Sequence, residues 1–537
     1  MKRLSTLLVL LAVAFAAPAF VRGDVVVGPG GGTPGTSLNF TLVGHNALFS
    51  RGMNAALASY DHFIYVGNRT DGSSRCGVGD PRRETTGLDS CPHPHPGILV
   101  VDVANPANPT VVGEIGAPHA ANPSETTREL RVWPQKKLLM VLSFRCSPVI
   151  HACKGDAVTP TFRFFDLSDP ANPQHLMTYI PVQLSEEPGG GEHHETRVPH
   201  EFFLWVDPKN ADRALLWAST PTTSCDPART NLVIYDISRV RDGVEPSPIA
   251  QGNWNDQYPG GCDPANYDFD LSLHSMTPSF DGTRTYLAYL RGTFLVLDTS
   301  KVANNQIPAG TVESLNDDLL TPVANRPLWG AGNQCAGHTP VGCAESHSAV
   351  PLPGRPFAFT VDEVYGTFTV PSFGWPWGWT RLINVAEPRR PHIVGEYKIF
   401  QNTPAYTPAP GENEFNSYSS HNPTVTRNVV LDSWHSGGLQ AIDVSDPGAP
   451  AQLGWYSPTP LASVANEDPA LSRGPNKVVM WSFPIVRNGL IYVIDIRNGL
   501  YVFDYNGPRA SEIDGLKFLE GNSNLGDARR LAKSAHP

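Results

Sequence analysis

The sequence predicts an all-β protein, a seven-bladed β-propeller with disulfide-bearing loop insertions. Three observations lead to this prediction. The 537 residues include 51 Pro and 48 Gly but only 17% charged residues, a composition typical of many short strands and turns. Seven apolar runs each end in an Asp or Asn beside a turn, and they recur at intervals of 59 to 86 residues. A repeat of this length has room for the four strands of a propeller blade.

The apolar runs are the predicted strands. They are rich in Val, Ile, Leu, Phe and Tyr, which suit a buried pleated sheet. An Asp or Asn at the end of such a run accepts hydrogen bonds from backbone N–H groups of the turn, so we expect a structural rather than a catalytic role. These residues are Asp102, Asp166, Asp236, Asp298, Asn384, Asp443 and Asp504.

The chain is predicted to consist of four consecutive segments. Residues 1–19 form a signal peptide, because Lys2 and Arg3 precede a short apolar run and a small-residue cleavage site. Residues 20–43, which contain GPGGGTPG, form a flexible segment; residues 44–507 form the propeller, and residues 508–537 form a tail with a short helix near 527–533. No later stretch has the roughly 18 uninterrupted apolar residues of a membrane-spanning helix. We therefore expect an exported protein, periplasmic or extracellular, without stable membrane insertion.

Cysteine content and net charge limit the compartment and the partners. The eight cysteines lie in local pairs, which suits loop disulfides in an oxidising compartment. The net charge of −11 argues against a nucleic-acid partner, because phosphate contacts require a basic surface. A small-molecule substrate or an extracellular ligand is expected instead. The predicted pairs are Cys76 with Cys91, Cys146 with Cys153, Cys225 with Cys262, and Cys335 with Cys343.

Four histidines recur at a nearly constant interval. His200, His274, His347 and His421 are separated by 73 or 74 residues, and each opens a predicted blade. Side chains at one register of a ring of repeats face a common centre, so we expect these imidazoles to converge. Imidazoles suit Zn, Cu, Fe or Ni, whereas Ca and Mg prefer oxygen ligands. Alternatively, each histidine hydrogen-bonds backbone and ties neighbouring blades without a metal. A looser alignment of the other blades places Asn54, Arg128 and Ser482 at the same register.

Three segments, VVDVANPANPTVVGEI, FFDLSDPANPQHLMTYI and AIDVSDPGAPAQLGWYS, resemble LVIVD repeats. LVIVD repeats occur in secreted or surface-associated bacterial β-propellers, and the resemblance extends from residue 44 to residue 507. It implies the fold and says little about chemistry. One histidine per blade is also similar to carotenoid-cleavage oxygenases, which hold iron with four histidines. It is likewise similar to selenium-binding proteins, which include methanethiol oxidases and are associated with copper.

These observations predict an exported Cu- or Fe-dependent oxidoreductase, with Zn as a further possibility, that acts on a small organic substrate. The four repeated histidines would hold the ion. Arg128 would stabilise developing negative charge, and His194 or His435 would transfer protons. Asp362 and Glu363 would accept hydrogen bonds from an imidazole behind the ion.

The alternative prediction is a non-catalytic extracellular module that binds a protein or a glycan through its loops. The segment from Trp375 to Trp379 would then stack on the ligand, unless these rings pack between blades. His93 and His95, in the sequence CPHPHPG, form a separate candidate for a surface Cu or Zn site.

Overall fold

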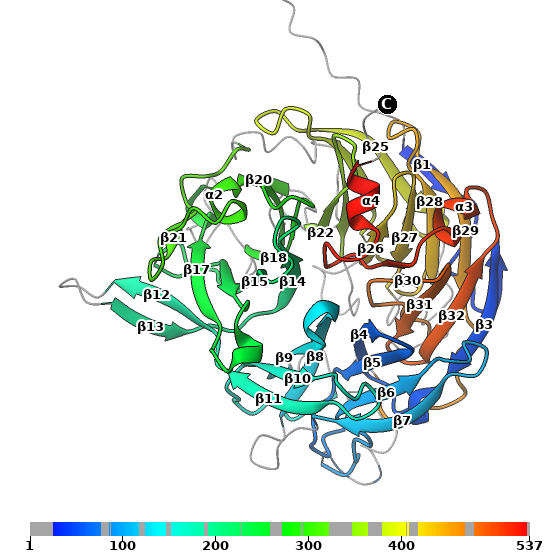
Figure 1. The fold of residues 1–537 in the computed structure, drawn as a ribbon. Helices are drawn as coiled ribbons and strands as arrows, with labels where there is room; N and C mark the ends of the chain where they lie inside the picture. The colour runs from blue at the N-terminus through cyan, green and yellow to red at the C-terminus, as the bar shows by residue number, and fades with distance from the viewer. Residues whose placement is uncertain are drawn as a thin grey trace, which may run out of the picture.

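The chain folds as an all-β propeller, with antiparallel sheets arranged around a common centre (Figure 1). The computed structural model describes residues 25–76, 85, 87, 89–116, 124–146, 152–186, 192–226, 228–257, 271–290, 294–321, 346–363, 378–403, 405–406, 417–467 and 477–533. The predicted signal peptide, residues 1–19, therefore lies outside the described residues.

Each sheet is a meander of strands that follow one another in the sequence, and its first strand lies nearest the centre (Figure 1). The first two meanders are β4 (Asn54–Tyr60), β5 (Phe63–Asn68), β6 (Ile98–Asp102) and β7 (Thr110–Ile115), then β8 (Glu125–Trp133), β9 (Leu138–Arg145), β10 (Thr161–Asp166) and β11 (Gln174–Tyr179). Pairing of Asn68 in β5 with Thr127 in β8 joins these two into one eight-stranded sheet. The next two are β14 (Glu201–Val206), β15 (Ala214–Ser219), β16 (Leu232–Asp236) and β17 (Ser247–Gly252), to which β21 (Glu313–Ser314) adds, then β18 (Ser272–Pro278), β19 (Arg284–Leu290) and β20 (Phe294–Asp298). The last three begin with β22 (Ser346–Pro351), β23 (Phe357–Asp362), β24 (Thr380–Asn384) and β25 (His392–Ile399). They continue with β26 (Asn422–Val425), β27 (Val429–Ser433), β28 (Leu439–Asp443) and β29 (Ala451–Ser457), and end with β30 (Ile485–Arg487), β31 (Leu490–Asp495) and β32 (Gly499–Tyr505). A separate hairpin, β12 (Val182–Glu186) and β13 (Glu192–Thr196), projects from the ring, and the short helix α2 (Ser300–Ala303) follows β20 (Figure 1).

The hydrophobic core lies between neighbouring sheets. One cluster joins Trp217 of β15 to Leu273 of β18 and Leu287 of β19, all fully or almost fully buried. Because both faces of each inner strand are covered, the strand sequences are nearly continuous apolar runs. This packing of sheet on sheet explains the abundance of Val, Leu and Ile before each turn.

The repeated Asp and Asn residues have the predicted structural role. In six of the seven positions the side-chain oxygen accepts a hydrogen bond from the backbone N–H two residues later, at 2.7 to 3.0 Å. This bond closes the turn that follows the strand. The six residues are Asp102, Asp166, Asp236, Asp298, Asn384 and Asp443.

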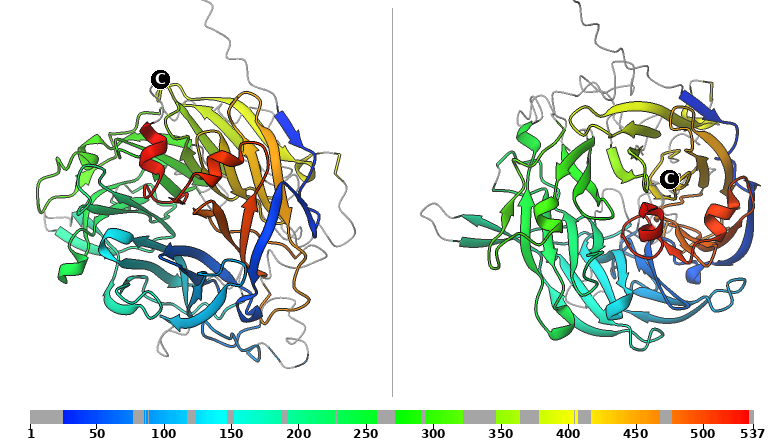
Figure 2. Two further views of the ribbon diagram at one scale, coloured as in Figure 1. Left: turned by 45° about the vertical axis from the view of Figure 1, so that its right-hand side comes forward. Right: turned by 45° about the horizontal axis from the view of Figure 1, so that its top comes forward.

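The prediction of a flexible segment over residues 20–43 is wrong for the part that the structure describes. β1 (Val25–Gly28) pairs with β25, β2 (Thr36–Leu38) with β29, and β3 (Phe40–Asn46) with β32. These strands run along the outside of the ring (Figure 2) and satisfy backbone groups at three sheet edges. The glycines serve this packing. A Cβ on Gly30 would lie 2.2 Å from the Trp455 ring, and Gly31 has φ of +104°.

The C-terminal segment crosses the ring. β33 (Phe518–Leu519) pairs with β30, whereas Asn524 hydrogen-bonds both backbone groups of Val206 in β14 at 2.8 Å. The segment therefore joins two sheets that are not neighbours, and it lies near the centre of the face seen in Figure 1. It includes α3 (Ala510–Asp514) and α4 (Ala528–Lys533), and α4 confirms the predicted short helix.

Two of the predicted disulfides are confirmed. Cys76 is bonded to Cys91 and Cys146 to Cys153, which supports an oxidising compartment. The partners needed for the other two pairs, Cys262, Cys335 and Cys343, lie outside the described residues. None of the described helices has the length and the apolar character needed to cross a membrane.

Candidate metal centre

The repeated histidines lie where the innermost strands begin. His274 and His347 each occupy a β-bulge, since the pairing register shifts between Leu273 and Ser275 and between Ser346 and Ser348. A bulge leaves one residue outside the ladder and changes the direction of its side chain. The same shift occurs at Arg128 in β8, between Thr127 and Glu129. Three positions of the register predicted from the sequence therefore have a common local structure.

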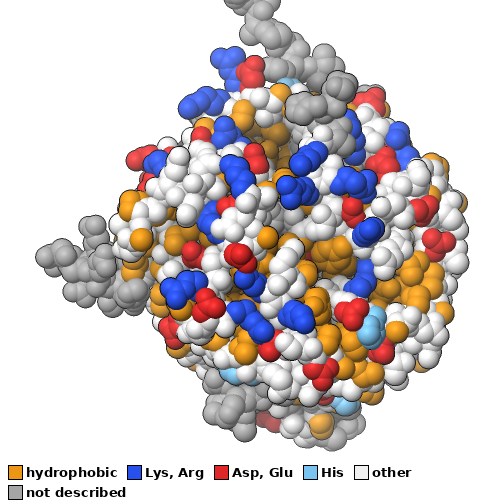
Figure 3. Space-filling view, in the orientation of Figure 1, with side chains coloured by type: hydrophobic (Ala, Val, Ile, Leu, Met, Phe, Trp, Pro, Cys, Tyr) orange, Lys and Arg blue, Asp and Glu red, His pale blue; other side chains and the backbone are white. Residues whose placement is uncertain are grey.

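Successive histidines form a continuous row. The ring centroids of His200 and His274 lie 4.5 Å apart, those of His274 and His347 3.8 Å, and those of His347 and His421 4.2 Å. His274, His347 and His421 are all buried. On the face shown in Figure 3 histidine side chains are visible only toward the edge of the molecule. The predicted convergence of four imidazoles is thus observed.

A carboxylate that the sequence did not assign to the ion lies at the centre of this group. Glu363, directly after β23, is buried, and its Oε2 lies 3.3 Å from Nε2 of His347. Its Oε1 lies 3.4 Å from Nε2 of His421 and 3.3 Å from Nε2 of His435. The sequence predicts that Glu363 and Asp362 both stand behind an imidazole. The side chain of Asp362 instead pairs with Arg381, which also contacts Glu396 at 3.2 Å.

His435 extends the row. It follows β27 in a left-handed conformation with φ of 32°, and it is fully buried. Its ring lies 4.8 Å from that of His421 and stacks on Trp481 at 5.0 Å. Its Nδ1 lies 3.1 Å from the hydroxyl of Ser417, so Nε2 is the nitrogen that faces Glu363. His435, predicted to transfer protons, therefore lies among the side chains that could bind a metal ion.

Hydrogen bonds fix which nitrogen of two imidazoles carries the proton. Nδ1 of His421 lies 2.7 Å from the carbonyl of Trp481, which can only accept, so this nitrogen donates. Nδ1 of His347 lies 2.9 Å from the hydroxyl of Ser348, which donates to Asn422 and is therefore free to accept from the imidazole. In the neutral form of both rings, Nε2 then presents a lone pair toward Glu363.

Burial keeps these imidazoles neutral. It lowers the pKa of His347 and of His421 well below the usual 6.5, and neighbouring histidines add to the effect. Burial also lowers the pKa of His274 to about 4. Nε2 of His421 and Oε1 of Glu363 make no hydrogen bond within the described part of the chain. Two acceptors facing each other in a buried site are stabilised by a cation between them.

The donor atoms form two groups that could hold a metal ion. One group consists of His274, His347 and Glu363, and the other of Glu363, His421 and His435. Within each group all donor atoms lie within 4.8 Å of one another, and every residue is buried. His200 stands beside His274 at the end of the row, but it belongs to neither group.

Charged side chains flank the row at both ends. The guanidinium of Arg69 lies over the Trp481 ring at 3.7 Å, and that of Arg128 lies over the Phe144 ring at 5.1 Å. Phe144 in turn lies 5.9 Å from His200. Arg128 is thus near the end of the row, where the sequence placed it.

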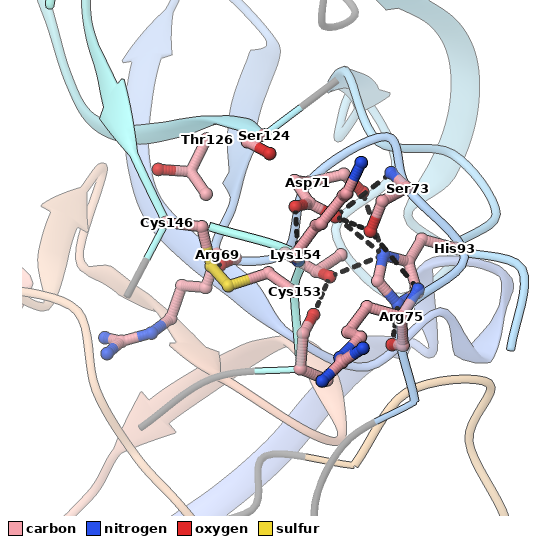
Figure 4. The surroundings of a disulfide bond; sticks show 12 residues. Arg69, Asp71, Ser73, Arg75, His93, Ser124, Thr126, Cys146, Cys153 and Lys154 are labelled. Carbon is pink, nitrogen blue, oxygen red and sulfur yellow. Dashed lines mark hydrogen bonds and ion pairs between the residues drawn. A yellow bond between two sulfur atoms is a disulfide. The ribbon is translucent and has the colours of Figure 1, made fainter. Parts of the chain in front are cut away.

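Arg69 is held in place by a cross-linked loop (Figure 4). Asp71 accepts hydrogen bonds from the backbone of Lys154 and from Ser73, and its Oδ1 lies 3.1 Å from Nδ1 of His93. Arg69 points away from this cluster, beside the Cys146–Cys153 disulfide (Figure 4). The loop that carries Arg69 is therefore tied to the segment that follows β9.

The two histidines of the CPHPHPG segment each contact other parts of the protein. Nε2 of His93 lies 2.8 Å from the carbonyl of Arg75, so both of its ring nitrogens have protein partners. His95 instead contacts Glu114 at 2.8 Å and stacks on Phe49. The two histidines have separate structural partners, so they do not share an ion.

The remaining sequence candidates are only partly described. His194 lies in β13, but its side chain is outside the described part of the structure. Trp375 and Trp377 also lie outside the described residues. Trp379 is buried in a core cluster with Lys398 over its ring at 3.7 Å, which favours blade packing over ligand stacking for this ring.

One segment of the chain matches a known protein family. The LVIVD repeat family matches residues 95–116. This segment is an LVIVD repeat. The LVIVD repeat consists here of β6, the turn closed by Asp102, and β7. The resemblance noted in the sequence is thereby confirmed for this segment.

Among solved structures, Sqt1 from Saccharomyces cerevisiae is similar with a TM-score of 0.46 and 8% identity, over 88% of this chain and 100% of that chain. A putative 6-phosphogluconolactonase from Bacteroides uniformis is similar with a TM-score of 0.38 and 10% identity, over 76% of this chain and 86% of that chain. The C-terminal WD40 domain of Sif2 has a TM-score of 0.40 and 8% identity, over 87% of this chain and 98% of that chain. A search of curated proteins found no significant match.

Proposed function

We propose that the protein is a metal-dependent oxidoreductase that acts on a small organic substrate in the central channel. The position of Glu363 carries this proposal. One buried carboxylate lies 3.3 to 3.4 Å from Nε2 of three buried histidines. Donors bound at 2.0–2.1 Å to one tetrahedral ion lie about 3.3 Å from one another. The spacing therefore supports a preformed metal site.

The donor set favours iron. Each group contains two imidazoles and one carboxylate, a combination that suits iron(II) and leaves coordination positions open. Copper also accepts imidazole ligands, and zinc is the third candidate. An imidazole-rich set does not suit calcium or magnesium, which prefer oxygen ligands. A bound iron or copper ion would supply electron transfer and a position for oxygen or substrate.

Each residue of the site then has a proposed role. His274, His347, His421, His435 and Glu363 hold the metal, which assigns His435 a ligand role in place of the predicted proton transfer. The hydrogen bonds on Nδ1 of His347 and His421 orient Nε2 toward the ion. The Trp481 ring lies between His435 and Arg69 and closes one side of the site.

Arg128 and His200 lie at the other end of the row. The Arg128 guanidinium would stabilise negative charge on a substrate or product next to His274. His200 is outside both donor groups and would bind substrate or carry a proton. His194 keeps its predicted proton-transfer role as a proposal.

We further propose that the sheets are the seven blades of one ring. The pairing of β3 with β32 supports this proposal, because it joins the N-terminal part of the chain to the last sheet. Such closure would fix the spacing of histidines that come from different blades.

Metal content tests the proposed function. Protein purified without a histidine tag would be analysed by elemental mass spectrometry, as isolated and after anaerobic loading with Fe(II). We expect stoichiometric Fe or Cu in the wild type and at least a tenfold weaker affinity in Glu363→Gln. Glu387→Gln, an exposed carboxylate in a turn, is the matched control and should retain the metal. A wild-type protein that binds no Fe or Cu after loading would overturn the proposal.

A binding function is the second candidate, and a cavity on the other face favours it. A cavity of about 560 Å³ lies among the ends of β18 and β22 and the C-terminal segment, with Pro278, Pro351 and Glu520 in its lining. The histidines lie at the opposite ends of the same strands. Loss of binding on filling this cavity, with no effect of Glu363→Gln, would support a metal-independent binding protein.

A further inference from the structure

We infer that the centre holds two metal ions bridged by the carboxylate of Glu363. This inference rests on the proposed metal-dependent function and specifies the number of ions. Glu363 belongs to both donor groups, and its two oxygens face different histidines. Oε2 faces His347, whereas Oε1 faces His421 and His435. A carboxylate with this orientation gives one oxygen to each of two ions.

Distance limits favour two ions over one. Two ligands of one ion can be at most about 4.2 Å apart if each bond is about 2.1 Å long. The donor atoms that lie within 4.8 Å of one another form two groups among the described residues, and these groups share only Glu363, with no group that contains histidines of both. Paired ions in enzymes are typically about 3.5–4 Å apart, a separation that one carboxylate spans. Each half of the row then supplies two imidazoles to its own ion.

A second buried carboxyl stands behind each half. Glu201 places Oε2 3.7 Å from Nδ1 of His274, and neither atom makes a hydrogen bond within the described residues. A carboxylate behind a ligating imidazole fixes the ring and increases its basicity. On the other side the buried Asp432 accepts from the Ser420 hydroxyl at 2.6 Å and from the backbone of His421. Glu201 therefore lies beside an imidazole of one half, whereas Asp432 holds the backbone of His421 in the other.

The row extends beyond the first half to a histidine that is only partly buried. His200 extends the first half beyond His274, with a centroid separation of 4.5 Å. Trp481 closes the second half, since it stacks against both His421 and His435. A two-ion centre in this arrangement would receive a small substrate from the side of His200 and Arg128.

Copper binding to the full chain tests the number of ions. Metal-free protein would be loaded with excess Cu(II) and desalted, and the bound copper would be counted by elemental analysis. Electron paramagnetic resonance would then detect a half-field transition, which only two nearby Cu(II) ions produce. We expect two equivalents and a half-field transition in the wild type. The exposed variant His175→Ala is the control and should give the same result.

Two double variants separate the halves. His274→Ala/His347→Ala and His421→Ala/His435→Ala should each retain one equivalent, with an isolated Cu(II) spectrum and no half-field transition. Circular dichroism would verify that each variant is folded. Glu363→Gln keeps the side-chain volume, and it should lose the half-field transition even in preparations that still bind copper.

The outcomes distinguish this inference from the proposed function. One equivalent in the wild type would overturn the two-ion centre and leave the metal-dependent function standing. No bound copper in the wild type would also overturn the two-ion centre, and only the absence of both bound copper and bound iron after loading would overturn the metal-dependent function as well. A folded double variant that binds no copper would also overturn the inference, because the two halves would then not be separate sites.

Discussion

Ring closure by the N-terminal strand β3 should be a main source of stability, and Phe40→Ala tests this directly. Phe40 is only 6% exposed, and its ring contacts those of Phe503 and Tyr505 of β32 with centroid distances of 6.0 and 5.0 Å. Replacing a buried Phe with Ala typically destabilises a protein by about 3–5 kcal/mol, through lost burial and the cavity left behind. We expect a decrease of this size in the free energy of unfolding.

Leu42 provides the matched control for this change. It lies two residues further along the same strand, but it is 42% exposed. Leu42→Ala leaves the backbone pairing with β32 intact and should cost less than about 1 kcal/mol. Both variants would be unfolded in guanidinium chloride at pH 7 and followed by tryptophan fluorescence. Equal costs for Phe40→Ala and Leu42→Ala would refute the idea that packing of β3 on the last sheet closes the ring.

Three further predictions concern other parts of the fold. Removing the Cys76–Cys91 disulfide, whose cysteines are 15 residues apart, should cost about 3 kcal/mol in denaturant unfolding, and an unchanged midpoint would contradict its role as a constraint on the unfolded chain. Arg381→Met should cost about 3–5 kcal/mol, because two buried carboxylates lose their common cation, and a neutral effect would show that they are protonated. Burial alone would raise the pKa of Asp71, but its hydrogen bonds, led by that from His93, outweigh burial and lower the pKa below 3.8. The ionised Asp71 carboxylate therefore stabilises the fold above pH 3.8, and this stabilisation is lost as the pH falls below that value. Asp71→Asn should therefore lose less stability than the wild type between pH 5 and pH 3, and parallel pH profiles would contradict this.

The site shows how far a repeat can be followed from sequence. His274, His347 and His421 were assigned to one register because their spacing is almost constant, and they do form one row. Glu363 and His435 occupy related places after β23 and β27, but they are different residue types, so no repeated residue pointed to them as ligands. The only signal was that each residue follows a predicted strand. This position suggested that both lie near the channel mouth, but it did not show which atoms they contact.

The N-terminal segment shows the opposite limit. A run of glycines and prolines has the composition of a linker, and this composition carries no information about distant sheet edges. The packing of Gly30 against Trp455 joins residues that are more than 400 positions apart. Only the closed ring brings the edges of β25, β29 and β32 within reach of this segment.

The sequence by itself determined the elements that depend on local physics. Apolar runs, Asp-closed turns and the register of the repeated histidines follow from interactions within one repeat, so each copy of the repeat reports the same structure. The tertiary structure alone decided which donors share one carboxylate, which strands cover the outer edges, and where the C-terminal segment crosses the ring. These features join different repeats, and their atoms meet only when the sheets pack around a common centre.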